Sequence, residues 1–126
     1  PEGHHHLSHH KGDEGMIDKI RRINQFQSSM LAELLDLMAK TPDGEGRLLD
    51  NTMLVYGGAI SDGNRHNHDN LPIILAGGGG GAFAGQGHVE FPDGTPLCNL
   101  YLTMLEQTGL SLDRFGDSTG TLSGLS

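Results

Sequence analysis

The stretch that decides the fold is Asn51–Gly77, NTMLVYGGAISDGNRHNHDNLPIILAG, in which two apolar runs flank a polar loop. The first run, Thr52–Tyr56, is short and rich in β-favouring residues, which is typical of a strand buried on both faces. The second run, LPIILA, ends at a run of glycines. We therefore predict strands over 51–60 and 71–76, joined by an Asp- and His-rich loop over 61–70.

One helix is predicted on each side of this stretch. Over 13–40, apolar residues recur at helical spacing and form one stripe. Asp13 can cap this helix, because its carboxylate can accept hydrogen bonds from the free N–H groups of the first turn. A second helix is predicted over 96–109, with Pro96 in its first turn and Gly109 as its C-terminal stop.

The remaining segments are polar and rich in glycine. We predict a His-rich loop over 1–12 and a turn-rich tail over 110–126. The order of elements predicts an α/β fold: a partial sheet of two or three mainly parallel strands, flanked by a long N-terminal helix and a shorter C-terminal helix. So few strands do not make a stable doubly wound sheet. We therefore expect residues 1–126 to be a fragment of a larger α/β domain.

The composition excludes several classes of partner. The chain has 126 residues and a formal net charge of −8. Its surface therefore repels phosphate backbones, and nucleic acid is not an expected partner. No apolar run approaches the roughly 20 residues that a membrane span needs. The single cysteine, Cys98, cannot form an intrachain disulfide, and we interpret it as a packed thiol near the start of the second helix.

The loop after the first predicted strand carries side chains that bind metals. Ligands of open α/β sheets bind at the carboxyl ends of strands, where Asp62, His66, His68 and Asp69 follow the first strand. Zn²⁺ takes histidine nitrogen and aspartate oxygen, and Mn²⁺ and Fe accept the same donors. In an extended loop, His66 and His68 point the same way. The alternative is that this Asn- and Asp-rich loop only makes turns.

A second group of histidines lies at the N-terminus, in the stretch HHHLSHH over 4–10. A purification tag is one interpretation, but Leu7 and Ser8 interrupt the run, unlike a common unbroken tag. Two separate His-rich loops in so short a chain favour a native metal site that both loops share. We interpret His88, which lies elsewhere, as a structural or surface residue.

With both loops considered, the sequence resembles a bacterial family of unknown function that is named for its HxxSHH motif and is common in planctomycetes. The motif stands here as His5-His6-Leu7-Ser8-His9-His10. Three further stretches match the family's pattern: LLDNTMLVYGGAISDGNRHNHDNLPIILAG, GTPLCNLYLTMLEQTG and DRFGDSTGTLSGL. The resemblance covers nearly the whole chain. It implies the C-terminal portion of a longer protein that is periplasmic or secreted.

The sequence is also similar, more distantly, to the alkaline phosphatase/sulfatase superfamily, which implies an alkaline-phosphatase-like half domain. In that comparison LSHH takes the place of an Asp-Thr-His loop, SDGN supplies an acidic ligand, NRHNHDN a later histidine and ILAGGGG the last strand. The implied ligands of a divalent metal (Zn, Mn or Fe) are His9 or His10, Asp62, and His66 or His68. Possible additional ligands are His5, His6 and Asp69, and Arg65 is a possible substrate contact.

The function that the resemblance implies is that of the metal-binding half of a metal-dependent hydrolase-like domain, acting on small anionic phosphate or sulfate esters. Asp-Gly stands where phosphatases have Asp-His, which indicates a single-metal or altered site. The superfamily's nucleophile lies in the N-terminal half, so this chain alone is expected to be inactive. The alternative is a non-catalytic metal- or partner-binding module of an exported bacterial assembly. In both cases we expect self-association through exposed apolar surface.

Overall fold

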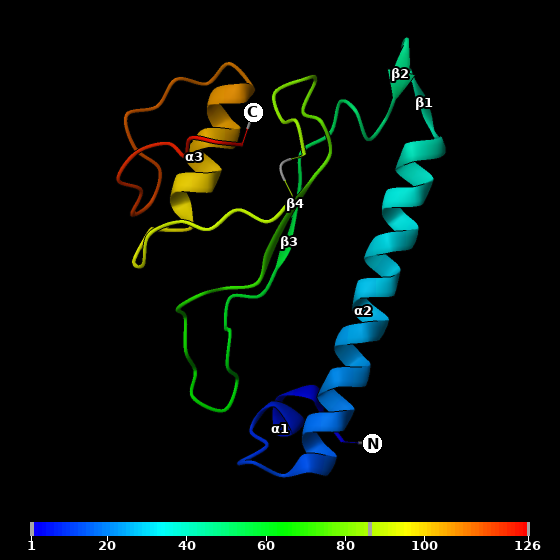
Figure 1. Cartoon of the computed structure of the whole chain (residues 1–126), viewed down its shortest axis with the longest axis vertical. Coiled ribbons are helices and arrows are strands. Elements are labelled where there is room, and N and C mark those ends of the chain that lie inside the picture. The colour runs from blue at the N-terminus through cyan, green and yellow to red at the C-terminus, as the bar shows by residue number, and fades with distance from the viewer. Residues whose placement is uncertain (1, 86, 126) are drawn as a thin grey trace. The chain divides into compact units, whose positions relative to one another are not determined.

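The computed structural model describes residues 2–85 and 87–125 and shows a mixed α/β structure with one long helix (Figure 1). The chain forms two compact units, the first made of 1–38 and 55–74 and the second of 39–54 and 75–126. None of the helices in the described part of the chain is long and apolar enough to cross a membrane. The helices are α1 (His4–Ser8), α2 (Glu14–Lys40) and α3 (Cys98–Gln107). The strands are β1 (Pro42–Asp43), β2 (Gly46–Arg47), β3 (Leu54–Gly57) and β4 (Ile73–Ala76).

Helix α2 is the long helix that the apolar periodicity predicts. The predicted cap is confirmed, since the backbone N–H of Met16 donates a hydrogen bond of 2.8 Å to Oδ1 of Asp13. Leu31 and Met38 on its apolar stripe are buried. The stripe also carries Phe26 and Leu37, which remain 64% and 63% exposed. The apolar surface of α2 is therefore only partly covered.

Strands β3 and β4 pair with each other as a two-stranded sheet, and the prediction of mainly parallel strands is wrong. The Gly58 N–H donates to the Pro72 carbonyl at 3.4 Å, and the Gly79 N–H donates to the Thr52 carbonyl at 3.0 Å. Thr52, which precedes β3, thus bonds to a residue after β4, and Gly58, which follows β3, bonds to a residue before β4. The pairing is therefore antiparallel. Parallel neighbours need a long crossover connection, usually a helix, whereas the described connection over 58–72 contains only turns and a bridge.

The glycine run after β4 packs in the second unit against the segment 49–52. The N–H groups of Gly78 and Gly80 donate to the carbonyls of Leu49 and Asp50, at 3.0 and 2.9 Å. A Cβ on Gly77, whose φ is +94°, would overlap the Thr52 carbonyl oxygen. Glycine is needed here because two backbones approach closely.

A small hairpin follows α2, where Pro42 pairs with Arg47 and Asp43 with Gly46. The guanidinium of Arg47 donates to the carboxylate of Asp50, with the shortest contact at 2.6 Å. This hydrogen bond is the main reason that the pKa of Asp50 lies below its ordinary value. The hairpin and its ion pair are exposed, and they form the connection that leads from α2 to β3.

Helix α3 and the C-terminal tail form the core of the second unit (Figure 1). Leu100 and Leu102 of α3 are buried, and so is Asn99. The amide of Asn99 donates to the hydroxyl of Thr119 at 3.1 Å and accepts from the Thr119 N–H at 2.8 Å. The hydroxyl of Thr103 accepts from the Leu122 N–H at 2.8 Å. The described part of the tail contains turns but no helix or strand. Its backbone groups therefore bond to side chains of α3 where a helix or a sheet would supply backbone partners.

We predict that Asn99→Ala lowers the free energy of unfolding by about 1–3 kcal/mol, because it leaves the Thr119 N–H without its buried partner. Chemical denaturation measures this loss. The matched control is Asn24→Ala, which makes the same change at an exposed position of a helix. Equal effects of the two substitutions would contradict the prediction.

Candidate functional site

The N-terminal histidines and the loop over 58–72 meet within the first unit. The ring centroids of His9 and His66 lie 4.7 Å apart. The ring of His5 lies 4.7 Å from that of His9, on edge to it. The backbone N–H of Lys11 donates to the side-chain oxygen of Asn64 at 3.1 Å, which ties the same two segments together. The structure therefore brings three imidazoles from two segments into one cluster.

Helix α1 places two of these imidazoles. His5 and His9 are four positions apart, so that they lie one helical turn from each other, with His9 as the C-cap. The hydroxyl of Ser8 donates to the carbonyl of His5 at 2.9 Å. Leu7 is buried, with 4% of its surface exposed, and anchors the helix. The segment 1–12, predicted as loop, therefore contains a short helix that sets the spacing of the histidines.

The turn that carries His66 is held by Asp62. One carboxylate oxygen of Asp62 accepts from the N–H groups of Asn64 and Arg65, at 2.9 and 3.3 Å. The guanidinium of Arg65 lies 3.5 Å from the other carboxylate oxygen. His66 itself has a φ of +54°, in the left-handed region that residues other than glycine seldom adopt. Asp62 thus shapes the turn that presents His66, and its carboxylate is engaged in doing so.

The other predicted ligands bond within their own segments. Nδ1 of His10 accepts from the Gly12 N–H at 3.1 Å. Nδ1 of His68 lies 2.7 Å from the carbonyl of Ala59, so it donates there. Asp69 uses its backbone N–H to bond Asn67 at 3.0 Å. His6 is exposed on α1. Among the predicted ligands, His9 and His66 are the pair whose rings meet between the two segments, and the others remain predicted ligands.

The environment of His9 favours its neutral form. Desolvation lowers the pKa of His9 below its ordinary value of 6.5, and the positive charges of His5 and His66 lower it further. Because the unfolded chain binds this proton more readily, protonation of His9 opposes folding as pH falls below about 6.5. Neutral imidazole is also the form that binds a metal.

The donor set suits a borderline divalent cation, but the side chains do not converge on one point as they stand. Within residues 2–85 and 87–125, no group of three or more His, Cys, Asp or Glu side chains is positioned to hold a metal ion. His5 and His66 flank His9, and both are exposed.

The resemblance ranks His5 below His10, because LSHH is the stretch that takes the place of the Asp-Thr-His loop. The signal that favours His5 is its spacing of four from His9, which matters only if the segment is helical. The buried Leu7 supplies the tertiary contact that a helix this short requires.

Comparison with family models, with curated proteins and with solved structures gives no match to this chain. The resemblance to the HxxSHH family therefore stays a prediction, and the site is defined by its own geometry.

We predict that Gly63→Ala separates the two segments. A Cβ at Gly63 would lie 2.8 Å from Cβ of Ser8, which is too close for either backbone to remain in place. The measurement is amide hydrogen exchange of Lys11, whose N–H bonds to Asn64 across the contact. Exchange should accelerate in Gly63→Ala.

The matched control for this prediction is Gly3→Ala, because a Cβ at Gly3 meets nothing within 4 Å. Its Lys11 amide should exchange as in the parent chain. Unchanged exchange in both variants would show that Ser8 and Gly63 are not packed against each other in solution.

Proposed function

We propose that this chain is the metal-binding half of a metal-dependent hydrolase-like domain that acts on phosphate or sulfate esters. The proposal rests on one observation. The ring centroids of His9 and His66, which come from two separate segments, lie 4.7 Å apart. The resemblance of HHLSHH and SDGNRHNHD to the HxxSHH family, and more distantly to alkaline phosphatases and sulfatases, supports the same reading.

The imidazoles of His9 and His66 would hold the metal, with His5 joining them after a change of rotamer. Histidine nitrogen is a donor for Zn²⁺ as well as for Mn²⁺ and Fe. A cation bound there would polarise an ester oxygen or lower the pKa of a bound water. Asp62 would hold the turn of His66 in place through its bonds to the N–H groups of that turn.

Arg65 is the residue of this turn that can contact an anionic substrate. Its side chain is 80% exposed, and its guanidinium lies 3.5 Å from Asp62, beyond hydrogen-bond distance. A guanidinium with free donors can form paired hydrogen bonds to two oxygens of a phosphate or sulfate.

A non-catalytic module of an exported assembly is the second candidate, and one observation favours it. Direct contacts join the two segments, namely the Lys11–Asn64 hydrogen bond and the close packing of Ser8 on Gly63. In this case a metal at His9 and His66 would only strengthen that connection.

We expect the chain to bind Zn²⁺ with one-to-one stoichiometry in calorimetry, with Mn²⁺ titrated in parallel. His9→Ala and His66→Asn should each weaken Zn²⁺ binding by at least about tenfold, because each removes a ligand. Asparagine is chosen at His66 because it tolerates a positive φ better than alanine does. His88→Ala, a change at an exposed histidine outside the cluster, should leave binding unchanged.

The absence of metal binding in a folded chain would contradict the hydrolase-like function and the metal-binding form of the module, and would leave only a partner-binding module. Hydrolysis of phosphate or sulfate esters by the longer parent protein, lost in His9→Ala and His66→Asn, would support the enzyme. Stoichiometric metal without hydrolysis in that protein would favour the non-catalytic module.

We also propose that two copies of the chain associate through α2. Met30 and Leu34 are exposed beside Phe26 and Leu37. Together with Ile23, these residues are spaced 3, 4, 4 and 3 positions apart, which is symmetric about Met30. In an antiparallel pair, each apolar residue of the stripe therefore faces an apolar residue, with Phe26 opposite the partner's Leu34. A two-fold interface requires this self-complementarity.

Met30→Glu should shift the chain from dimer to monomer in sedimentation measurements over a range of concentrations, because it places two like charges at the centre of the pair. Gln25→Glu adds the same charge at an exposed position away from the stripe and should leave the dimer intact. A parent chain with the mass of a monomer at every concentration would contradict the proposal.

A further inference from the structure

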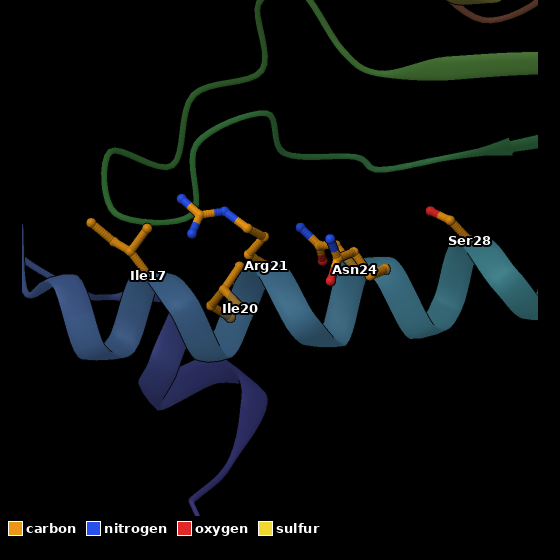
Figure 2. Close-up of a pocket in the computed structure, with 6 residues that line it drawn as sticks. Ile17, Ile20, Arg21, Asn24 and Ser28 are labelled. Atoms are coloured by element: carbon orange, nitrogen blue, oxygen red, sulfur yellow. The ribbon is translucent and has the colours of Figure 1, made fainter.

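A shallow groove runs along α2 in the same unit as the histidine cluster (Figure 2). Two half-buried isoleucines, Ile17 and Ile20, supply its apolar surface. The polar residues beside them carry hydrogen-bond donors. These are Arg21, Asn24, Gln25 and Ser28. None of the described residues that line the groove is acidic, although the chain as a whole is.

The charge of Arg21 is only weakly neutralised by its own helix. Asp18 lies 2.8 Å from the guanidinium of Arg22, which is hydrogen-bond distance. The same carboxylate lies 3.6 Å from the guanidinium of Arg21, which is too long for a hydrogen bond. The side chain of Arg21 is nevertheless the more covered of the two, 62% exposed against 77% for Arg22. Arg21 therefore supplies a positive charge at the surface of the groove.

Figure 2 shows Ile17 and Arg21 on the side of α2 that faces the loop between β3 and β4. That loop carries Arg65 and His66. The described residues that line the groove all belong to α2.

The chemistry of the groove matches an anionic group joined to an apolar one. A phosphate or sulfate group needs a positive charge and several donors, and a guanidinium can offer two parallel N–H groups to it. The amides of Asn24 and Gln25 and the hydroxyl of Ser28 can supply further donors. The isoleucines offer apolar surface to an aryl or alkyl group, as small-molecule sites commonly do.

We propose that this groove binds the substrate, a phosphate or sulfate monoester of an apolar alcohol, with its anionic group on Arg21 and its aryl or alkyl group over Ile17 and Ile20. The assignment as substrate rests on the proposed function, whereas the binding itself does not require a metal. Arg21 is a binding residue in this proposal.

The test is an NMR titration of the full chain with phenyl phosphate and phenyl sulfate, without added metal and at low ionic strength, where exposed charges are least screened. Amide signals over 17–28 should shift and saturate. Arg21→Gln should weaken binding of both probes about tenfold, the effect of losing one charge-assisted hydrogen bond. Arg22→Gln, the same change one residue along, should leave the affinity within about twofold.

Two further probes separate the parts of the ligand. Inorganic sulfate should bind more weakly than phenyl sulfate because it lacks the apolar group, and phenol should bind more weakly because it lacks the charge. The proposal is overturned if the parent chain shows no shifts over 17–28, or if phenol binds as well as phenyl sulfate. Equal losses in Arg21→Gln and Arg22→Gln would also overturn it, since they would show attraction to the general charge of α2.

His66→Asn distinguishes a failure of the groove from a failure of the metal site. It should lose Zn²⁺ binding while its affinity for phenyl phosphate stays within about twofold, because no residue of the groove is altered. Loss of phenyl phosphate binding in this variant would place the anion on the histidine turn and overturn the assignment to Arg21. The thermal unfolding of each variant establishes that it is folded.

Discussion

The close packing of Ser8 on Gly63 is the constraint on which the candidate site depends. A side chain at Gly63 would lie within 2.8 Å of Cβ of Ser8, so the two segments can approach only because this residue is glycine. The approach brings the Lys11 N–H to Asn64 and the ring of His9 to that of His66. Without it, the two His-rich segments would be unrelated surface features of one acidic chain.

The arrangement that brings the histidines together is disfavoured by the backbone conformation of His66 and by repulsion between protonated imidazoles. His66 adopts a positive φ, which costs of order 1–2 kcal/mol for a residue other than glycine. The imidazoles of His5 and His66 disfavour a proton on His9. Two interactions offset these costs. The carboxylate of Asp62 accepts hydrogen bonds from N–H groups of the turn, and Leu7 of α1 is buried. Local strain at a cluster of donor side chains is an arrangement that functional sites share, which is consistent with the proposed metal site.

Helix α2 has different surfaces for different roles. Leu31 and Met38 are buried, while Phe26 and Leu37 face solvent. Around the helix from these residues, Arg21 and its neighbours form a groove without carboxylates. The helix thus has a buried apolar surface, an exposed apolar surface and the groove. The spacing of apolar residues predicts an apolar stripe, but it does not distinguish these three surfaces. Which part of the stripe is covered depends on tertiary contacts, which the spacing of apolar residues does not encode.

Much of the local structure follows from the sequence alone. The apolar period predicts α2, and the carboxylate of Asp13 caps it as expected, because both depend on residues within a few positions of each other. The same holds for the two apolar runs that become β3 and β4. Their direction does not follow, since an apolar run of this length carries no information on whether its neighbour is parallel or antiparallel.

The choice among eight histidines was made only by the tertiary structure. Helix α1 depends on the burial of Leu7, and so the spacing of His5 and His9 depends on it too. Which imidazoles meet depends on a turn shaped by Asp62 and on the space that Gly63 leaves for Ser8. Composition and motif determined that two donor-rich loops exist. Contacts between segments far apart in the chain, which no local pattern encodes, decided that His9 and His66 are the histidines that meet across the two loops.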